Sequence, residues 1–194
     1  MHILRVFPRL LAALLMVVVL PALAGPRVSV SELIGRTVAD ANGNAIGELT
    51  DVIFDARDGT IRAVTVDFGR WLRVGSREAA FPLAQISRAG KAIVLDVPER
   101  ELRRAPPAER PDWPSLSAAW LIGREVRDRL HRDSGEMVDL VADLDAARIV
   151  QAVIRLPEEW AADRIALPLD ELTLPRELGQ YATLDVTRER LARP

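Results

Sequence analysis

Hydrophobic and polar residues alternate along several short stretches of the chain, and this period of two is typical of β-strands. In residues 61–68 (IRAVTVDF), Val64, Val66 and Phe68 fall on one face, which is expected to face a core. Helical patterning is brief and is confined to residues 98–105 and 187–192. The chain is therefore predicted to be all-β or mainly β, with short helical turns.

Clusters of turn-forming residues separate these strands. Asp, Asn and Gly gather in residues 39–45 (ADANGNA), and Asp58-Gly59 lies within residues 55–60 (DARDGT). Both segments are predicted to be hairpin turns. Short strands with turns about every eight to twelve residues favour a small barrel or sandwich.

The pattern occurs twice along the chain. Residues 33–55 (LIGRTVADANGNAIGELTDVIFD) align without a gap with residues 121–143 (LIGREVRDRLHRDSGEMVDLVAD), 88 positions later, and ten of the 23 positions are identical. The same shift places residues 61–68 opposite residues 149–156, where Ala152, Ile154 and Leu156 take the positions of the apolar face. The sequence therefore predicts an internal duplication.

A proline-rich segment lies between the two copies. Residues 105–118 contain four prolines, and such a segment favours a semi-rigid, extended linker. We therefore expect a first repeat at residues 26–104, a linker at 105–118 and a second repeat at 119–194.

The first 24 residues are expected to lie outside the fold. Arg5 and Arg9 precede an apolar run at residues 10–20, and Ala22-Leu23-Ala24 precedes Gly25. This order is typical of a secretory signal peptide, here with cleavage after Ala24 and a periplasmic mature chain. The alternative is a retained membrane anchor, although the run of about eleven residues is short of the roughly 20 that span a bilayer.

Composition narrows the class of protein. The 194 residues include 26 basic and 28 acidic side chains and no cysteine. The balanced charge argues against a nucleic-acid binder. The absence of cysteine excludes disulfides, zinc fingers and thiol catalysis.

The features of each copy, taken in order, resemble the PRC-barrel. They are the LIG-x-x-V start at residue 33, the IGELTDVIFD segment that ends at Asp55, the Pro82-Leu83 pair and the closing LDVPERELRRAP. This β-barrel is named for the photosynthetic reaction centre H subunit, and it also forms the C-terminal part of a ribosome-maturation protein. The resemblance implies two consecutive six-stranded PRC-type barrels that serve as adaptor or regulatory surfaces, with no catalytic motif. In the second copy, residues 130–133 (LHRD) replace the Asn-Gly-Asn turn.

Acidic residues recur in both copies. If residues 39–45 form a hairpin turn, Arg36 lies opposite Leu49 and diagonal to Asp51, which predicts an Arg36–Asp51 ion pair and, in the second copy, an Arg124–Asp139 pair. Asp55 and Asp143 close their strands and are expected to accept turn N–H bonds. Ca²⁺ or Mg²⁺ would need these oxygens to converge, but Glu48 points away from Asp51 on a strand, so we assign no metal and no cofactor.

Two matching loops are candidates for an interaction surface. The first carries Arg70, Trp71, Arg73 and Arg77, and the second carries Glu158, Glu159 and Trp160. Trp and Arg are typical interface anchors, so these loops could receive a partner or join the two barrels. The alternative is that each Trp plugs its own barrel end.

The remaining reactive residues show no catalytic pattern. His131 is the one histidine after residue 24, and the serines stand in no G-x-S-x-G or S-x-x-K setting. We expect a non-catalytic, exported adaptor or regulatory protein that binds a protein partner in the bacterial envelope. Two alternatives are a membrane-anchored accessory subunit of a photosynthetic or electron-transfer complex and, less favoured, a carboxylate-based hydrolase.

Overall fold

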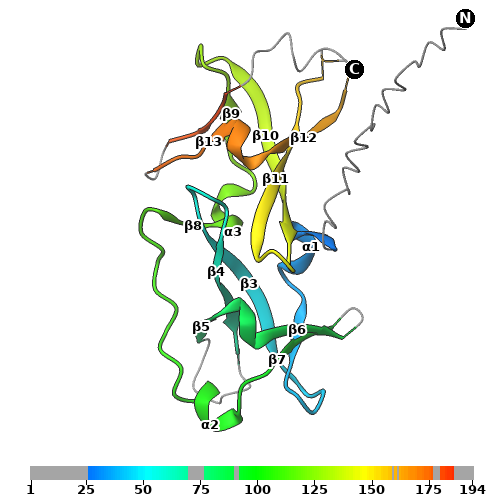
Figure 1. Ribbon diagram of the computed structural model, residues 1–194, viewed down its shortest axis with the longest axis vertical. Helices are drawn as coiled ribbons and strands as arrows, with labels where there is room; N and C mark the ends of the chain where they lie inside the picture. Colours follow the sequence, from blue (N-terminus) through cyan, green and yellow to red (C-terminus); the bar gives the residue numbers. More distant parts are fainter. Residues whose placement is uncertain are drawn as a thin grey trace, which may run out of the picture.

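The computed structural model describes residues 26–69, 77–89, 92–158, 160, 162–176 and 180–185, without the side chains of Arg88 and Ala89. The predicted signal peptide, its cleavage site and the predicted helical segment at 187–192 lie outside the described residues. The protein is mainly β, as expected, and its two halves lie one above the other along the long axis (Figure 1).

The first half forms one sheet with the strand order β5-β4-β3-β2-β7-β6. Its strands are β2 (Thr37–Ala39), β3 (Ala45–Asp55), β4 (Ile61–Asp67), β5 (Glu78–Phe81), β6 (Ile86–Ala89) and β7 (Ala92–Leu95). A 3-10 turn, η1 (Leu83–Gln85), precedes β6, and the short helix α2 (Glu99–Leu102) follows β7. Only the β2–β7 pairing is parallel within this order.

The second half repeats this arrangement in the order β12-β11-β10-β9-β14-β13. Its strands are β9 (Glu125–Arg127), β10 (Asp133–Asp143), β11 (Arg148–Arg155), β12 (Arg164–Pro168), β13 (Leu172–Thr173) and β14 (Ala182–Leu184), with η2 (Leu169–Glu171) before β13. The pairing of β9 with β14 is parallel, like that of β2 with β7. The described parts of the two halves therefore share one topology.

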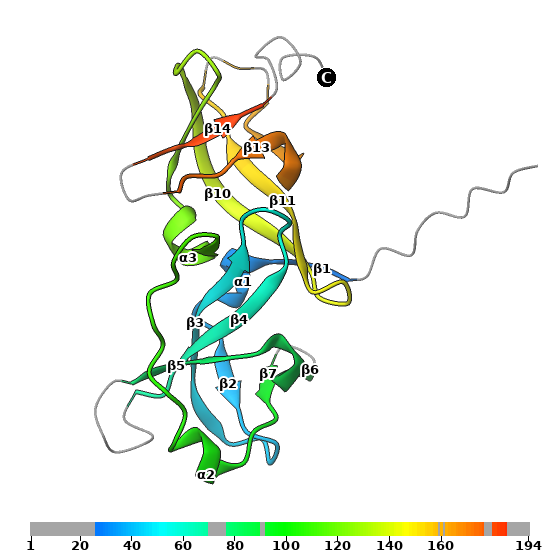
Figure 2. The same ribbon diagram turned by 60° about the vertical axis from the view of Figure 1, so that its left-hand side comes forward.

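Each half donates a strand to the other. Strand β1 (Arg27–Ser29) pairs with β10 of the second half, and β8 (Ser115–Ser117) pairs with β3 of the first half. A short helix follows each donated strand, α1 (Val30–Leu33) after β1 (Figure 2) and α3 (Ala118–Leu121) after β8 (Figure 1). Among the described residues, each sheet thus has seven strands rather than the six that the resemblance implied.

This exchange corrects the expected division of the chain. Strand β1 was assigned to the first repeat but completes the second sheet, while β8 was assigned to the linker but belongs to the first sheet. The exchange buries apolar side chains, because Val28 of β1 and Leu116 of β8 are each only 8% exposed. The hydrophobic cores of the two halves are accordingly continuous.

Reciprocal hydrogen bonds join the two long hairpins where the halves meet. The N–H of Ile61 donates to the carbonyl of Ala147 at 2.8 Å, and the N–H of Ile149 donates to the carbonyl of Gly59 at 2.8 Å. These positions are related by the same 88-residue shift as the duplicated sequences. The interface is therefore built from equivalent residues of the two copies, as in a symmetric dimer.

The turns and strand faces expected from the sequence are confirmed. Asp40 accepts N–H bonds from Asn42 and Asn44 in the first turn, and the second turn is closed by the N–H of Asp55, which donates to Thr60. The predicted apolar faces of β4 and β11 are buried.

Candidate functional site

Two aspartates hold the exchanged helices in place. On β3, Asp51 Oδ1 accepts the N–H of Ala119 in α3 at 2.9 Å, and on β10, Asp139 Oδ1 accepts the N–H of Ser31 in α1 at 2.9 Å. Both N–H groups lie in the first turn of a helix, where backbone donors have no partner within the helix. Each aspartate therefore helps to dock a helix from the opposite half.

The predicted ion pairs Arg36–Asp51 and Arg124–Asp139 are wrong. The backbone of Arg36 does lie opposite Leu49, but the pairing of β3 with β4 shifts register between Leu49 and Asp51, which turns Asp51 toward α3. Instead, Arg36 Nε donates to the carbonyl of Glu32 at 2.6 Å.

The second half shows the same correction. A register shift separates Met137 from Asp139, and Arg124 Nε donates to the carbonyl of Trp120 at 3.1 Å. In both halves the arginine therefore donates to a carbonyl of the short helix that precedes it. The aspartate instead accepts an N–H of the short helix from the opposite half.

A cleft lies beside Asp51, between the linker and the first sheet. It has a volume of about 740 Å³, within the range of ligand pockets. Its walls come from β3, β4 and β5, from linker residues 108–113, from α3, and from Pro175 and Arg176 of the second half. In Figure 1 the linker runs along the outside of the first sheet from β8 to α2.

Carboxylates outnumber guanidinium groups in this cleft. Its acidic residues are Asp51, Glu78, Glu109 and Asp112, and its basic residues are Arg110 and Arg176. Among the described residues, none of the four carboxylates forms an ion pair. The cleft therefore favours a cationic group.

Asp51 occupies an unfavourable electrostatic position. Burial raises the pKa of its carboxyl group, while hydrogen bonds from the Ser117 side chain and from the N–H groups of Ala119 and Val52 act in the opposite direction, and the nearby charge of Glu78 adds a smaller rise. An ionised carboxylate that has lost water without gaining a cation is destabilised. A bound cation would relieve this strain.

Two tryptophans flank the carboxylates. The Trp113 side chain is 40% exposed, and the guanidinium carbon of Arg176 lies 5.1 Å from its ring centroid. Trp120 is partly buried and has Arg124 at 4.7 Å on its ring, while its Nε1 is buried without a hydrogen-bond partner among the described residues. The walls of the cleft thus combine two aromatic side chains with carboxylates that form no ion pair among the described residues.

The structure describes only part of the predicted interaction loops. Arg70, Trp71, Arg73 and Glu159 lie outside the described residues, so their role stays a prediction. Arg77 donates to the carbonyls of Arg103 and Ala105, which ties the segment after α2 to the sheet. Glu158 is exposed, and Trp160 is partly buried against the hydrophobic core, as its alternative role as a plug requires.

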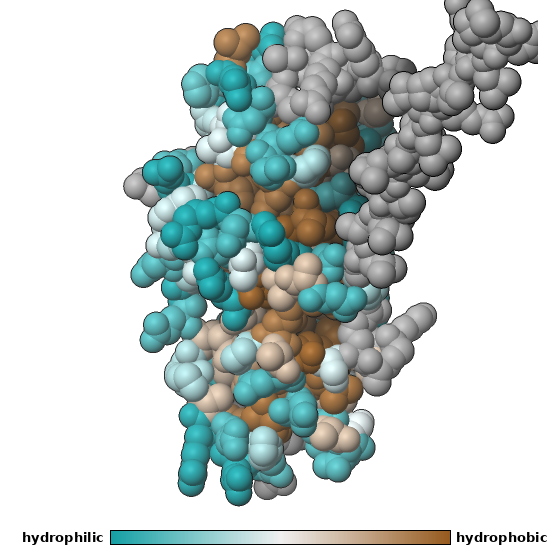
Figure 3. Space-filling model, viewed as in Figure 1, coloured by the Kyte–Doolittle hydropathy of each residue, from teal (hydrophilic) through white to brown (hydrophobic). Residues whose placement is uncertain are grey.

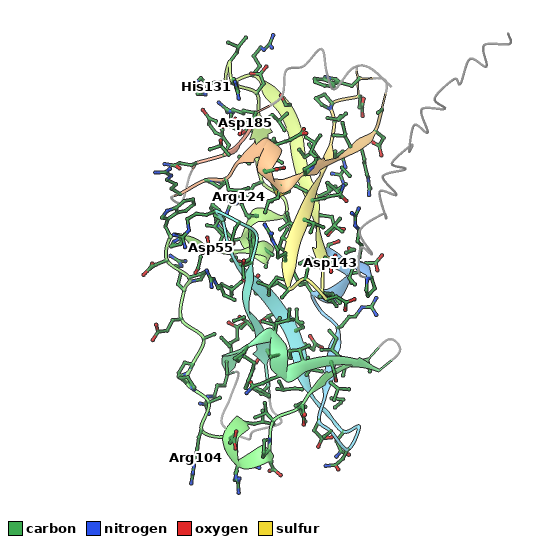
Figure 4. All side chains as sticks on the ribbon, viewed as in Figure 1. Asp55, Arg104, Arg124, His131, Asp143 and Asp185 are labelled. Atoms are coloured by element: carbon green, nitrogen blue, oxygen red, sulfur yellow. The ribbon has the colours of Figure 1, made fainter. Side chains whose placement is uncertain are left out.

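The aspartates at the ends of β3 and β10 are structural, as expected. Asp55 accepts the N–H of Arg57 at 3.0 Å and binds the guanidinium groups of Arg57 and Arg62, which hold the pKa of its carboxyl group well below the usual range. Asp143 accepts the N–H of Ala146 at 2.9 Å. The two residues lie on opposite sides of the molecule in Figure 4.

A second hollow lies where the halves meet. It has a volume of about 490 Å³ and is lined mainly by apolar side chains of the first sheet and of the β10–β11 turn. Figure 3 shows hydrophobic residues reaching the surface in both halves on this face, whereas the side along which the linker runs is mostly hydrophilic. The linker cleft is therefore the more polar of the two hollows.

Within the described part of the chain, no helix is long and apolar enough to cross a membrane. The same residues contain no group of three or more metal-binding side chains.

Sequence reasoning missed the cleft because its walls come from five separate segments of the chain. The two cleft aromatics lay in a segment interpreted as linker and at the start of the second copy. One signal in the sequence pointed to the helix that carries Trp120. Ser117 stands three residues before Trp120, as an N-cap would, and it accepts the N–H of Trp120 at 2.9 Å.

These observations define a duplicated β-protein in which two similar sheets exchange strands and a strap-like linker bounds a polar cleft. The family model of the PRC-barrel domain matches residues 26–102, so this part of the chain is a PRC-barrel domain. The match begins just before β1 and ends at α2, and thus includes the strand that the first half donates. No curated protein matches the chain closely enough to count as a relative.

Proposed function

We propose that the protein is a non-catalytic tandem PRC-barrel adaptor, exported to the bacterial envelope, which binds a protein partner in the linker cleft. The observation that carries this proposal is the cleft itself, whose carboxylates have no ion-pair partners among the described residues and whose walls hold two tryptophans. Trp at the centre of a desolvated surface is a typical anchor of protein interfaces.

The second half extends the PRC-barrel proposal to the whole mature chain. Its strand order repeats that of the matched domain, and its sequence repeats the LIG start and the closing Asp. The signal-like N-terminal sequence supports export to the periplasm.

Affinity capture from envelope extracts tests the binding proposal. Wild-type protein should recover a defined partner, and Trp113→Ala should lose it, because Trp113 is the most exposed aromatic wall of the cleft. Leu130→Ala serves as a control, since Leu130 is an exposed hydrophobic residue that does not line the cleft. A Trp71→Ala arm tests the loop predicted from sequence, and recovery unchanged in Trp113→Ala would refute the cleft as the docking surface.

Mass spectrometry of the N-terminus tests export. A mature chain that begins at Gly25 supports the periplasmic adaptor. A chain that retains residues 1–24 supports the alternative of a membrane-anchored accessory subunit of a photosynthetic or electron-transfer complex.

A further inference from the structure

Resting on the proposed function, we propose that the linker cleft recognises an arginine side chain of its partner, with the guanidinium group bound by Asp51 and Glu78. The cleft contains four carboxylates and two guanidinium groups, so it carries a net charge of about two negative units when all are ionised. None of these carboxylates has an ion-pair partner among the described residues.

The strand register places the two carboxylates on one face of the sheet. Asp51 on β3 lies opposite Thr65 on β4, and Thr65 lies opposite Ala80 on β5. Glu78 is two residues from Ala80 along β5, and side chains two apart on a strand point to the same face. Both residues line the cleft, so one cation can approach both.

The position of Asp51 explains why a cation should bind here rather than elsewhere on the surface. Exposed carboxylates gain little from a cation because water already solvates them. Asp51 is partly buried, with N–H groups of Val52 and Ala119 on Oδ1, and burial raises the pKa of the group. A cation therefore recovers part of the solvation that folding removed.

The aromatic walls favour a guanidinium over an ammonium group. A guanidinium is planar, stacks on Trp and can donate to two carboxylate oxygens at once. One wall already shows this preference, because the guanidinium of Arg176 lies over Trp113.

Titration of the mature protein with three matched peptides tests this inference. The probes are acetyl-Gly-Arg-Gly-amide and its lysine and citrulline counterparts, and binding is followed by the indole N–H signals of the tryptophans in NMR spectra. The arginine peptide should shift the signals of Trp113 and Trp120 in a saturable way. The lysine peptide should bind more weakly, and the neutral citrulline peptide should not bind.

Charge-removing variants then locate the site. Asp51→Asn keeps an oxygen that can accept the N–H of Ala119 but removes the charge, and it should weaken binding of the arginine peptide by about tenfold. Glu78→Gln should weaken it in the same direction. The matched control is Asp139→Asn, which makes the same substitution at the equivalent helix-docking position outside the cleft and should leave binding unchanged.

The outcomes separate this inference from the proposed function. No saturable shift up to about 10 mM arginine peptide, equal binding of the citrulline peptide, or equal effects of Asp51→Asn and Asp139→Asn would each overturn the arginine inference. If Trp113→Ala still abolished partner capture in those cases, the proposed function would stand. If the arginine peptide bound at Asp51 but Trp113→Ala left partner capture unchanged, the inference would stand and the protein-docking proposal would fail.

Discussion

Gly59 packs closely against the opposite half, so its substitution by alanine gives a direct test of the interface. Gly59 has φ of +76° in the β3–β4 turn, where an L-residue other than glycine costs about 1–2 kcal/mol. A Cβ at this position would overlap the carbonyl oxygen of Ile149 and lie 3.1 Å from Leu169 Cδ2. Because the overlapped atom belongs to the backbone of β11, relief requires the hairpins to move apart, which adds about 1–3 kcal/mol.

Gly59→Ala should therefore lower the free energy of unfolding by about 2–5 kcal/mol, measured by urea denaturation. Since the cores are continuous, far-UV circular dichroism and Trp fluorescence should report one shared transition at lower urea.

The matched control is Ala147→Gly. Ala147 is the equivalent residue of the other hairpin and has φ of +51°, so glycine should relieve strain and stabilise by about 0.5–1 kcal/mol. If Gly59→Ala had wild-type stability, or if both substitutions acted with the same sign, the proposed tight contact between the hairpins would be wrong.

Three further predictions concern the exchange and the charges. Arg57 and Arg62 hold the pKa of Asp55 below its unfolded value near 4, so the contribution of this carboxylate to stability is present above that pH and is lost as the pH falls through the native pKa. Asp55→Asn should therefore lower the free energy of unfolding at pH 7, measured by urea titration, and should make that free energy depend less on pH in the acid range. Leu33→Ala, in the first repeat, should cost about 2–5 kcal/mol and speed amide hydrogen exchange in β10 of the second half, because α1 packs there; acceleration confined to the first sheet would contradict the exchange. A protease site inserted after Arg110, an exposed linker residue, should give two fragments that elute together by gel filtration, whereas separate fragments would show that the exchanged strands do not hold the halves.

The sequence predicts those features that depend on local chemistry. The period of two in β4, the Asp-Asn-Gly turn and the 88-residue duplication each require only neighbouring residues or a comparison of the chain with itself, and each agrees with the structure. The partners of Asp51 and Asp139 could not be obtained in this way. Pairing rules within a hairpin place an arginine beside each aspartate, but a one-residue register shift and a helix from the opposite copy decide the actual contact.

The exchange of strands could not be predicted from the sequence because the two copies are so similar. Strands β1 and β8 are equivalent in sequence position, so either could pair with β3 or with β10 without changing the alternation of apolar residues. The choice depends on how the linker and the two hairpins fit together in space, which no local pattern records.

The duplication also explains how the proposed binding site could arise in a protein built of equivalent halves. Asp51 and Asp139 dock their helices through the same hydrogen bond, so the shared part of the design is structural. The differences fall beside Asp51: α3 carries Trp120 where α1 carries the exposed Glu32, and the proline-rich linker adds Trp113 and two further carboxylates. Because stability requires only the contacts that both copies share, residues outside those contacts are free to change in either copy. Beside Asp51, these residues are aromatic side chains and carboxylates without ion pairs among the described residues.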